Sequence, residues 1–308
     1  MIRLENVTKK FGDFTALDNI DLVISKGTSF GLLGSNGAGK STILRLLAGI
    51  YKQEAGNVTV DGENVFDNVA IKKKVFFIND ETVQFGSFTL GGLKRYFKGF
   101  YPNFSEEIFE QLRSRVKLPD GKKLDTFSKG MKRQAVVISG LACRTDYLLL
   151  DEAFDGLDPT MRIIVKRMLV DAMIDRQLTT VISSHNLKEI NEVCDSVALL
   201  HQGKILFNRD LDSVKGNIHK VQAAFPREYS RADFEKYGIM DYSRSGSVHY
   251  IIMKGSEEEI RTKLGEKSPT LLDLIPLSLE EIFIYEMAQT GYDAGGIDGI
   301  DERSGNTI

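Results

Sequence analysis

The chain has 308 residues, of which 42% are apolar and 27% are charged, and its formal net charge is −3. This composition is ordinary for a globular protein, is compatible with one large domain or two, and gives no sign of global disorder. The slightly acidic balance argues against a nucleic-acid partner, which usually requires a basic surface.

Cysteine usage and hydropathy bear on the compartment. Cys143 and Cys194 are far apart and lack metal-ligand spacing, so we expect two core thiols in a reducing cytosol. No run approaches the roughly 18 apolar residues that span a bilayer, and the first residues lack the basic and apolar regions of a signal peptide. We therefore expect the protein to be made and kept in the cytosol and to reach a membrane only through a partner.

The N-terminal residues predict strands around a turn. Residues 2–7 and 20–24 are strand candidates, and residues 28–33 form the apolar run of a buried strand. The first turn contains two aromatic residues, upstream of a glycine-rich loop. Such a ring can stack on adenine, with Phe11 the better candidate and Phe14 the alternative, or it can simply cap the sheet.

The glycine-rich loop at residues 34–42 reads Gly-Ser-Asn-Gly-Ala-Gly-Lys-Ser-Thr and lies between a predicted strand and an amphipathic helix over residues 42–48. It fits the phosphate-loop pattern Gly, four residues, Gly-Lys-Ser. Glycines let the backbone approach phosphate oxygens, so that its amides and the helix N-terminus bind the anion. Lys40 can reach the β- and γ-phosphates, and the Ser41 hydroxyl can ligate Mg²⁺. The loop therefore predicts a nucleoside triphosphate site formed by Gly34, Ser35, Asn36, Gly37, Ala38, Gly39, Lys40, Ser41 and Thr42.

Further along, residues 56–65 predict a hairpin around Asp61-Gly62, and residues 75–78 predict a strand that ends in Asn79-Asp80-Glu81.

The pattern then becomes helical from residue 90 to residue 117, with many aromatic side chains and a break at Pro102. We expect most of these aromatics to lie in the core or on a surface that faces a partner. Ser128 is placed like the N-cap of the apolar helix that follows it.

Two short apolar runs predict central parallel strands. Residues 147–150 are followed by Asp151 and Glu152, and residues 179–184 are followed by His185. Alternating strands and helices imply a mostly parallel sheet, and ligands bind at the carboxyl edge of such sheets. The phosphate loop, Asp80, Asp151 and His185 all follow predicted strands, so one site can gather them. There, Asp151 can hold Mg²⁺ or one of its waters, and Glu152 can polarise an attacking water.

From about residue 216 the pattern changes. Strands are predicted at residues 219–225 and 247–253, and helices at 256–264 and 278–287. The tail that follows is rich in Gly, Asp and Ser, which is typical of disorder.

Residues 1 to about 215 resemble the ATP-binding cassette (ABC) ATPases. Residues 127–131, Phe-Ser-Lys-Gly-Met, are similar to the family signature, usually Leu-Ser-Gly-Gly-Gln, in which Ser128 and Gly130 match. Residues 151–159, Asp-Glu-Ala-Phe-Asp-Gly-Leu-Asp-Pro, resemble the Walker B motif and the D-loop, and Ser184-His185 resembles the switch histidine.

The resemblance implies an α/β fold: a P-loop NTPase core with a mostly parallel sheet, an antiparallel β subdomain and a helical subdomain at about 82–142. It predicts an ABC ATPase domain over residues 1–215, while the pattern and composition that follow predict a small α+β C-terminal domain over 216–288 and a disordered tail over 289–308. It also implies ATP and Mg²⁺ as cofactors, with Lys40, Glu152 and His185 catalytic.

For the metal, the resemblance implies Ser41, Asp151 and Asp80, although Glu81 is open for the last place. Two cassettes would pack head to tail, as a homodimer or with a related cassette, so that Ser128, Gly130 and Asp158 of one meet the ATP bound by the other.

The function that the resemblance implies is ATP hydrolysis that drives export through separate integral membrane subunits, with the cassette peripheral on the cytoplasmic face of the membrane. Import is the alternative with the same catalysis. A soluble cassette acting on nucleic acid or the ribosome is an alternative of another class, although no nucleic-acid partner is expected.

Overall fold

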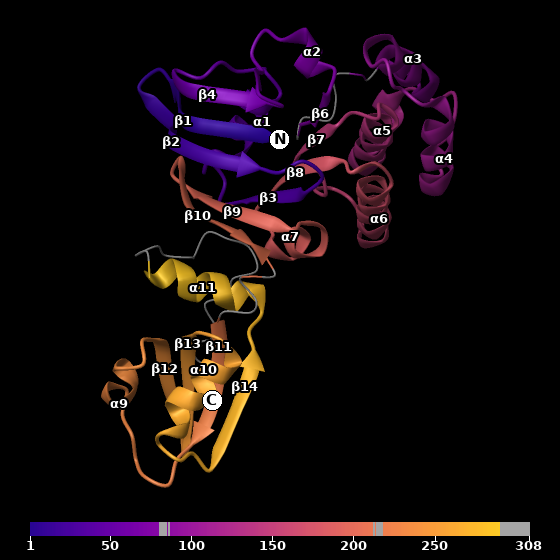
Figure 1. The fold of residues 1–308 in the computed structure, drawn as a ribbon. Helices are drawn as coiled ribbons and strands as arrows, with labels where there is room; N and C mark the ends of the chain where they lie inside the picture. The colour runs from indigo at the N-terminus through magenta and orange to yellow at the C-terminus, as the bar shows by residue number, and fades with distance from the viewer. Residues whose placement is uncertain (80–84, 86, 212, 214–217, 290–308) are drawn as a thin grey trace. The chain divides into compact units, whose positions relative to one another are not determined.

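The computed structural model describes residues 1–79, 85, 87–211, 213 and 218–289 (Figure 1). The chain divides into two compact units, Met1–Asn208 and Arg209–Ile308. The boundary predicted after residue 215 lies within the second of these units. Within the described ranges, no helix is both long enough and apolar enough to span a bilayer.

A four-stranded antiparallel sheet begins the first unit, in the order β2-β1-β4-β5 (Figure 1). Its strands are β1 (Ile2–Phe11), β2 (Phe14–Ile24), β4 (Ala55–Val60) and β5 (Glu63–Asn64). Between β4 and β5, Asp61 and Gly62 have φ values of 53° and 83°. Two successive left-handed residues are what a type I′ hairpin turn requires, so the hairpin predicted there is confirmed.

The second sheet has six strands in the order β10-β9-β3-β8-β7-β6. They are β3 (Ser29–Leu33), β6 (Val75–Ile78), β7 (Tyr147–Asp151), β8 (Thr179–Ser184), β9 (Ser196–His201) and β10 (Lys204–Asp210). The five strands from β9 to β6 pair in parallel. Every residue of β3, β7 and β8 is buried, as expected of parallel strands covered on both faces. The predicted parallel sheet is confirmed.

Helix α1 (Lys40–Leu47) joins the two sheets through one hydrophobic core. Its apolar side chains are at most 1% exposed and pack with residues of β1, β2 and β4 and with Leu32 of β3. Side chains alternate along a strand, so the neighbouring Gly31 faces the other way, toward α7 (Leu187–Val193). A Cβ at Gly31 would come within 2.5 Å of Ile190 Cγ2. Helices therefore cover both faces of β3.

The remaining helices of this unit are α2 (Val69–Lys72), α3 (Leu90–Phe100), α4 (Glu106–Val116), α5 (Lys129–Ala142) and α6 (Pro159–Arg176), with a short 3₁₀ turn at Leu124–Thr126. The predicted break at Pro102 separates α3 from α4. The predicted N-cap is also confirmed, because the Ser128 hydroxyl accepts the Met131 amide at 3.2 Å. Cys143 and Cys194 are free thiols, and burial raises the pKa of Cys194 to about 12.

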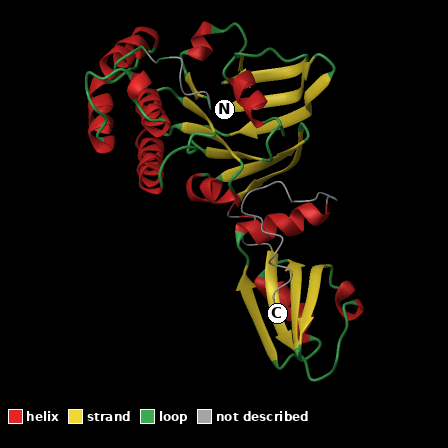
Figure 2. Cartoon of the chain, turned by 180° about the vertical axis from the view of Figure 1, so that it is seen from behind, coloured by secondary structure: helices red, strands yellow, loops and turns green. Residues whose placement is uncertain are grey.

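The second unit is an antiparallel sheet in the order β12-β13-β11-β14 with helices against it (Figure 2). Its elements are β11 (Ile218–Ala224), α9 (Ala232–Glu235), β12 (Ile239–Ser245), β13 (Val248–Lys254), α10 (Glu257–Gly265), β14 (Leu271–Pro276) and α11 (Leu279–Gln289). The predicted α+β character is confirmed, but α9 and the strands β12 and β14 were not predicted. Of the predicted tail, Gln289 ends α11 and residues 290–308 lie outside the described part of the chain.

Candidate functional site

The predicted phosphate loop joins β3 to α1, and its backbone conformation and close contacts require glycine at two positions. Gly39 precedes the helix with a φ of 113°, and a Cβ there would come within 2.7 Å of Leu17 Cδ2. A Cβ at Gly34 would lie 2.4 Å from the carbonyl oxygen of Leu200 in β9. Only glycine fits both positions. The loop thus places the N-terminus of α1 at the carboxyl end of β3, where free helix amides favour an anion.

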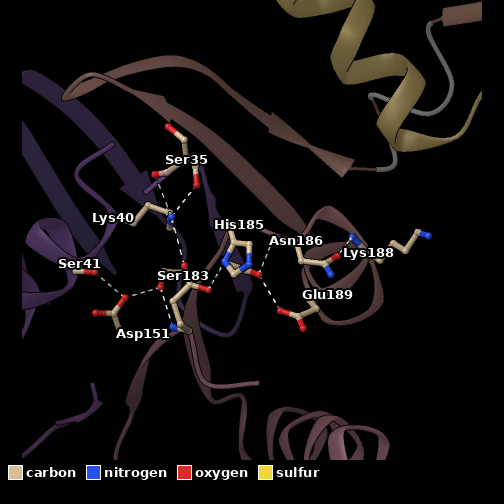
Figure 3. A network of polar contacts seen from close by, with 12 residues as sticks. Ser35, Lys40, Ser41, Asp151, Ser183, His185, Asn186, Lys188 and Glu189 are labelled. Atoms are coloured by element: carbon tan, nitrogen blue, oxygen red, sulfur yellow. Dashed lines mark hydrogen bonds and ion pairs between the residues drawn. The ribbon is translucent and has the colours of Figure 1, made fainter. Parts of the chain in front are cut away.

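Lys40 is 5% exposed, and its ammonium group is surrounded by oxygen atoms. Its Nζ donates to the carbonyl oxygens of Gly34 at 2.6 Å and Ser35 at 3.3 Å (Figure 3). It also forms an ion pair of 3.3 Å with Glu152 Oε1. The lysine therefore lies between the phosphate loop and the residue that follows β7.

Asp151, the last residue of β7, is fully buried. Its Oδ1 accepts hydrogen bonds from Ser41 Oγ at 2.9 Å and from Ser183 Oγ at 2.6 Å (Figure 3). Its Oδ2 is buried without a hydrogen-bond partner among the described residues. A buried carboxylate oxygen without a donor is unfavourable, and hard cations such as Mg²⁺ select carboxylate and hydroxyl oxygens. The donor set of Asp151 and Ser41 therefore fits Mg²⁺.

Glu152 connects the lysine to the histidine after β8. Its Oε2 lies 3.0 Å from His185 Nδ1, while its Oε1 pairs with Lys40. Its φ of 46° is uncommon for a residue other than glycine. Asp155 also lies close by, since one ligand atom from each of Glu152, Asp155 and His185 falls within 4.8 Å of the others. The structure thus gathers Lys40, Ser41, Asp151, Glu152 and His185, as predicted.

The signature and D-loop residues form a second group within the chain. Ser128 and Asp158 are exposed and cap the N-termini of α5 and α6, with Asp158 Oδ1 accepting the Met161 amide at 3.0 Å. Gly130 lies against the D-loop, where a Cβ would come within 2.9 Å of the Gly156 carbonyl oxygen. The two motifs therefore abut one another.

Phe11 lies at the β1–β2 turn and is 44% exposed, which leaves part of its ring available for stacking. Its ring meets Tyr51 edge to face at a centroid distance of 5.3 Å, and Lys9 Nζ lies 5.1 Å from its centroid. Phe14, the alternative, pairs with Phe11 across the hairpin and is 63% exposed. Tyr51 was not predicted to take part.

The predicted metal ligand Asp80 and its alternative Glu81 lie outside the described residues. The preceding residue, Asn79, is held by the buried Arg133 of α5, whose Nη1 donates to the Asn79 carbonyl oxygen at 2.6 Å.

Two further contacts were missed by sequence reasoning, those of Ser183 and Asp155. Neither residue belongs to a motif whose spacing would identify it; the strand position of Ser183, opposite Asp151, was the available signal.

Comparison with known proteins finds relatives among the ATP-binding proteins of ABC transporters. A family model described as ABC transporter matches residues 17–155. The chain is 30% identical to the ABC transporter ATP-binding protein YtrB of Bacillus subtilis (strain 168) over 284 residues, which cover 92% of this chain and 97% of the relative. It is 31% identical to the Bacitracin transport ATP-binding protein BcrA of Bacillus licheniformis, over 92% of this chain and 96% of that one.

The fold is also found among solved structures. A dimeric structure of a post-hydrolysis state of the ATP-binding cassette MJ0796, bound to ADP and Pi, matches with a TM-score of 0.62 and 22% identity. The match covers 68% of this chain and 99% of that one. At that level of identity, the likeness shows a shared fold.

Proposed function

The chain belongs to the ATP-binding proteins of ABC transporters, and on that premise we propose that it hydrolyses Mg²⁺-bound ATP at this site to drive export through separate membrane subunits. The observation that carries the proposal is the convergence of Lys40, Asp151, Glu152 and His185 at the ends of β3, β7 and β8. These strands are neighbours in the order β3-β8-β7, so the loops after them share one edge of the sheet.

Each residue has a role that suits its contacts. Phosphoryl transfer needs charge neutralised on the phosphate and a water held in line. Lys40 supplies a positive charge at the phosphate loop, and Asp151 with Ser41 would hold Mg²⁺, which neutralises further phosphate charge. Glu152 accepts a proton from the attacking water, and His185, 3.0 Å from its Oε2, orients that carboxylate.

We further propose that the active form is a dimer, with a second copy or a related cassette. Ser128 and Asp158 are exposed at helix N-termini, and Gly130 lies beside the D-loop. A hydroxyl and the amides of a helix N-terminus suit a phosphate group, so this surface can complete the ATP site of a partner. The dimeric solved cassette of the same fold supports this arrangement. ATP then favours the closed dimer because it binds that state more tightly.

The proposed docking site for the membrane subunit is a groove of about 500 Å³ between β6 and the helices. Aromatic rings dominate its walls: Phe76, Phe77, Phe85, Phe97, Tyr101 and Tyr51 line it, together with Arg45, Ile50, Asn79 and Val136. Aromatic side chains are enriched where proteins bind one another. A cassette bound there would lie on the cytoplasmic face of the membrane. The near full-length match to a bacitracin transport protein supports a role in transport, and export is the direction that we propose.

The proposal is tested by purifying the tagged chain from native membranes in mild detergent and identifying the proteins that accompany it. Ile50, at the groove, is 53% exposed, and Ile174, on α6, is 79% exposed, so Ile174→Asp is a matched control for Ile50→Asp. We expect a multi-span protein in stoichiometric amount with the wild type and with Ile174→Asp, and its loss with Ile50→Asp. Recovery of ribosomes or DNA in its place would overturn the transporter assignment, and an importer as the partner would overturn export.

A further inference from the structure

Ser183 is a buried serine at the end of β8 that touches both acidic residues of the site. Its Oγ donates to Asp151 Oδ1 at 2.6 Å and accepts the backbone amide of Glu152 at 3.0 Å (Figure 3). A hydroxyl has a single proton, so acceptance of the Glu152 amide leaves that proton directed at Asp151. One side chain therefore contacts both Asp151, the proposed metal ligand, and Glu152, the proposed general base.

We propose that Ser183 is a positioning residue that orients Asp151 toward the metal and holds the Glu152 backbone in its reactive conformation. The inference rests on the proposed roles of those two acidic residues, and it assigns to Ser183 a function that acts through them.

At Asp151, the hydroxyl determines which carboxylate oxygen is left for a cation. Oδ1 receives both Ser41 and Ser183, while Oδ2 has no hydrogen-bond partner among the described residues. Ser41 belongs to the phosphate loop, whereas Ser183 belongs to a buried strand of the sheet. Ser183 is therefore the donor that holds Oδ1 independently of the contacts of the loop.

At Glu152, the same hydroxyl supports an unusual backbone conformation. The φ of 46° lies in the left-handed region, which disfavours residues with a Cβ. The Glu152 amide is held by Ser183, and its carbonyl oxygen accepts the Asp155 amide at 3.1 Å in a turn. These two bonds set the direction in which the side chain leaves the backbone, toward Lys40 and His185. Loss of the Ser183 hydroxyl would remove the hydrogen bond that holds the Glu152 backbone amide.

The sheet itself makes the contact possible. In the parallel register of β7 and β8, Asp151 is paired with Ser183. Ser184 faces the opposite side, where its Oγ donates to the buried Glu189 at 2.8 Å. Of this pair of serines, Ser183 is thus the one whose side chain lies beside Asp151.

The decisive comparison is between Ser183→Thr and Ser183→Val, because these side chains have the same shape and differ in the hydroxyl. Ser183→Ala removes the hydroxyl without adding volume. Ser139→Ala is the matched control, since Ser139 is also fully buried but donates to the Ala135 carbonyl oxygen within α5. Three quantities are measured: the kcat of ATP hydrolysis, its KM, and the ratio of ATP dissociation constants in EDTA and in Mg²⁺.

Groups that orient metal-binding carboxylates typically contribute 10–100-fold to metal affinity or activity. We expect Ser183→Ala and Ser183→Val to lower kcat by about that factor and to reduce the Mg²⁺ enhancement of ATP affinity, with affinity in EDTA retained. Ser183→Thr should keep both kcat and the Mg²⁺ enhancement near wild type, as should Ser139→Ala.

Equal kcat and equal Mg²⁺ enhancement for the Thr and Val variants would overturn the inference, because shape and not the hydroxyl would then matter. Loss of ATP affinity in EDTA together with a lower melting temperature in both variants would also overturn it. If the wild type does not hydrolyse ATP, the proposed function itself fails. If Glu152→Gln is impaired but Ser183→Ala is not, the inference about Ser183 fails by itself.

Discussion

Replacement of Glu152 by glutamine tests the assignment of the catalytic base most directly. Glutamine keeps the shape of the side chain but removes its charge, so the ion pair with Lys40 Nζ at 3.3 Å is lost. The side chains of Lys40 and Glu152 are 6% and 16% exposed. Breaking a buried ion pair destabilises proteins by about 3–5 kcal/mol when the remaining charge is buried without a partner. Lys40 retains two carbonyl oxygens, so we expect a smaller loss of stability than that.

The catalytic effect should be much larger than the effect on binding. General-base assistance contributes on the order of 10²–10⁴ in rate, which corresponds to about 3–5 kcal/mol of transition-state free energy. We expect kcat to fall by that factor while ATP affinity is unchanged or higher, because one negative charge near the expected phosphate position is removed. An ATP-bound dimer should then accumulate, and size-exclusion chromatography with ATP would detect it.

Asp155→Asn is the matched control for this experiment. Asp155 has a ligand atom within 4.8 Å of those of Glu152 and His185, so both substitutions neutralise one carboxylate in the same cluster. We expect Asp155→Asn to reduce kcat less than about tenfold. The assignment of Glu152 is refuted if Glu152→Gln hydrolyses ATP at the wild-type rate, or if the two variants are equally impaired.

Three further predictions concern binding, packing and pH. Lys40→Ala should weaken ATP binding itself, measured by equilibrium titration, and unchanged affinity would contradict the phosphate-loop assignment. Gly31→Ala should lower the unfolding free energy by about 1–3 kcal/mol because the added Cβ would meet Ile190 at 2.5 Å. Gly99 in α3 has open space around it, so Gly99→Ala should raise the unfolding free energy by about 0.5–1 kcal/mol. Thermal melts in which both variants shift in the same direction would disprove this packing. Burial, and then the charge of Arg244, lowers the pKa of His249, so the stability it contributes is fully present above pH 6.5, its ordinary pKa, and is lost as the pH falls through its lowered folded-state pKa. Melting temperatures should therefore fall from about pH 7.5 to about pH 5.5, and less so for His249→Gln; an equal fall in both would rule out His249 as the cause.

The sequence predicted the parts of the fold in which local pattern and burial agree. The strands β7 and β8 are short runs of uncharged residues up to Asp151 and Ser184 because both their faces are covered, and the N-cap of α5 and the β4–β5 turn have local chemical signals. In the second unit, β12 and β14 were missed. Both are edge strands, where polar side chains and a terminal Pro276 weaken the alternating pattern.

In the site, too, the residues with a local sequence signal were predicted and those without one were not. Motif spacing identified Lys40, Asp151 and His185, because each follows a strand that the pattern reveals. The contacts of Asp155 and Ser183 were not identified, since they depend on which side chains face these residues across the sheet and the D-loop. A single serine or aspartate carries no signal of such a contact in the sequence.

The strand order explains why these contacts form one site. β8 lies between β3 and β7, so a side chain at its end is near both the phosphate loop and the acidic pair. Ser183 uses one face of that strand end to contact Asp151 and Glu152. Ser184 uses the other face to contact Glu189, which also pairs with Arg162 of α6 at 3.3 Å. Because Asp158 caps the N-terminus of α6, these contacts connect the proposed dimer surface to the residue before His185.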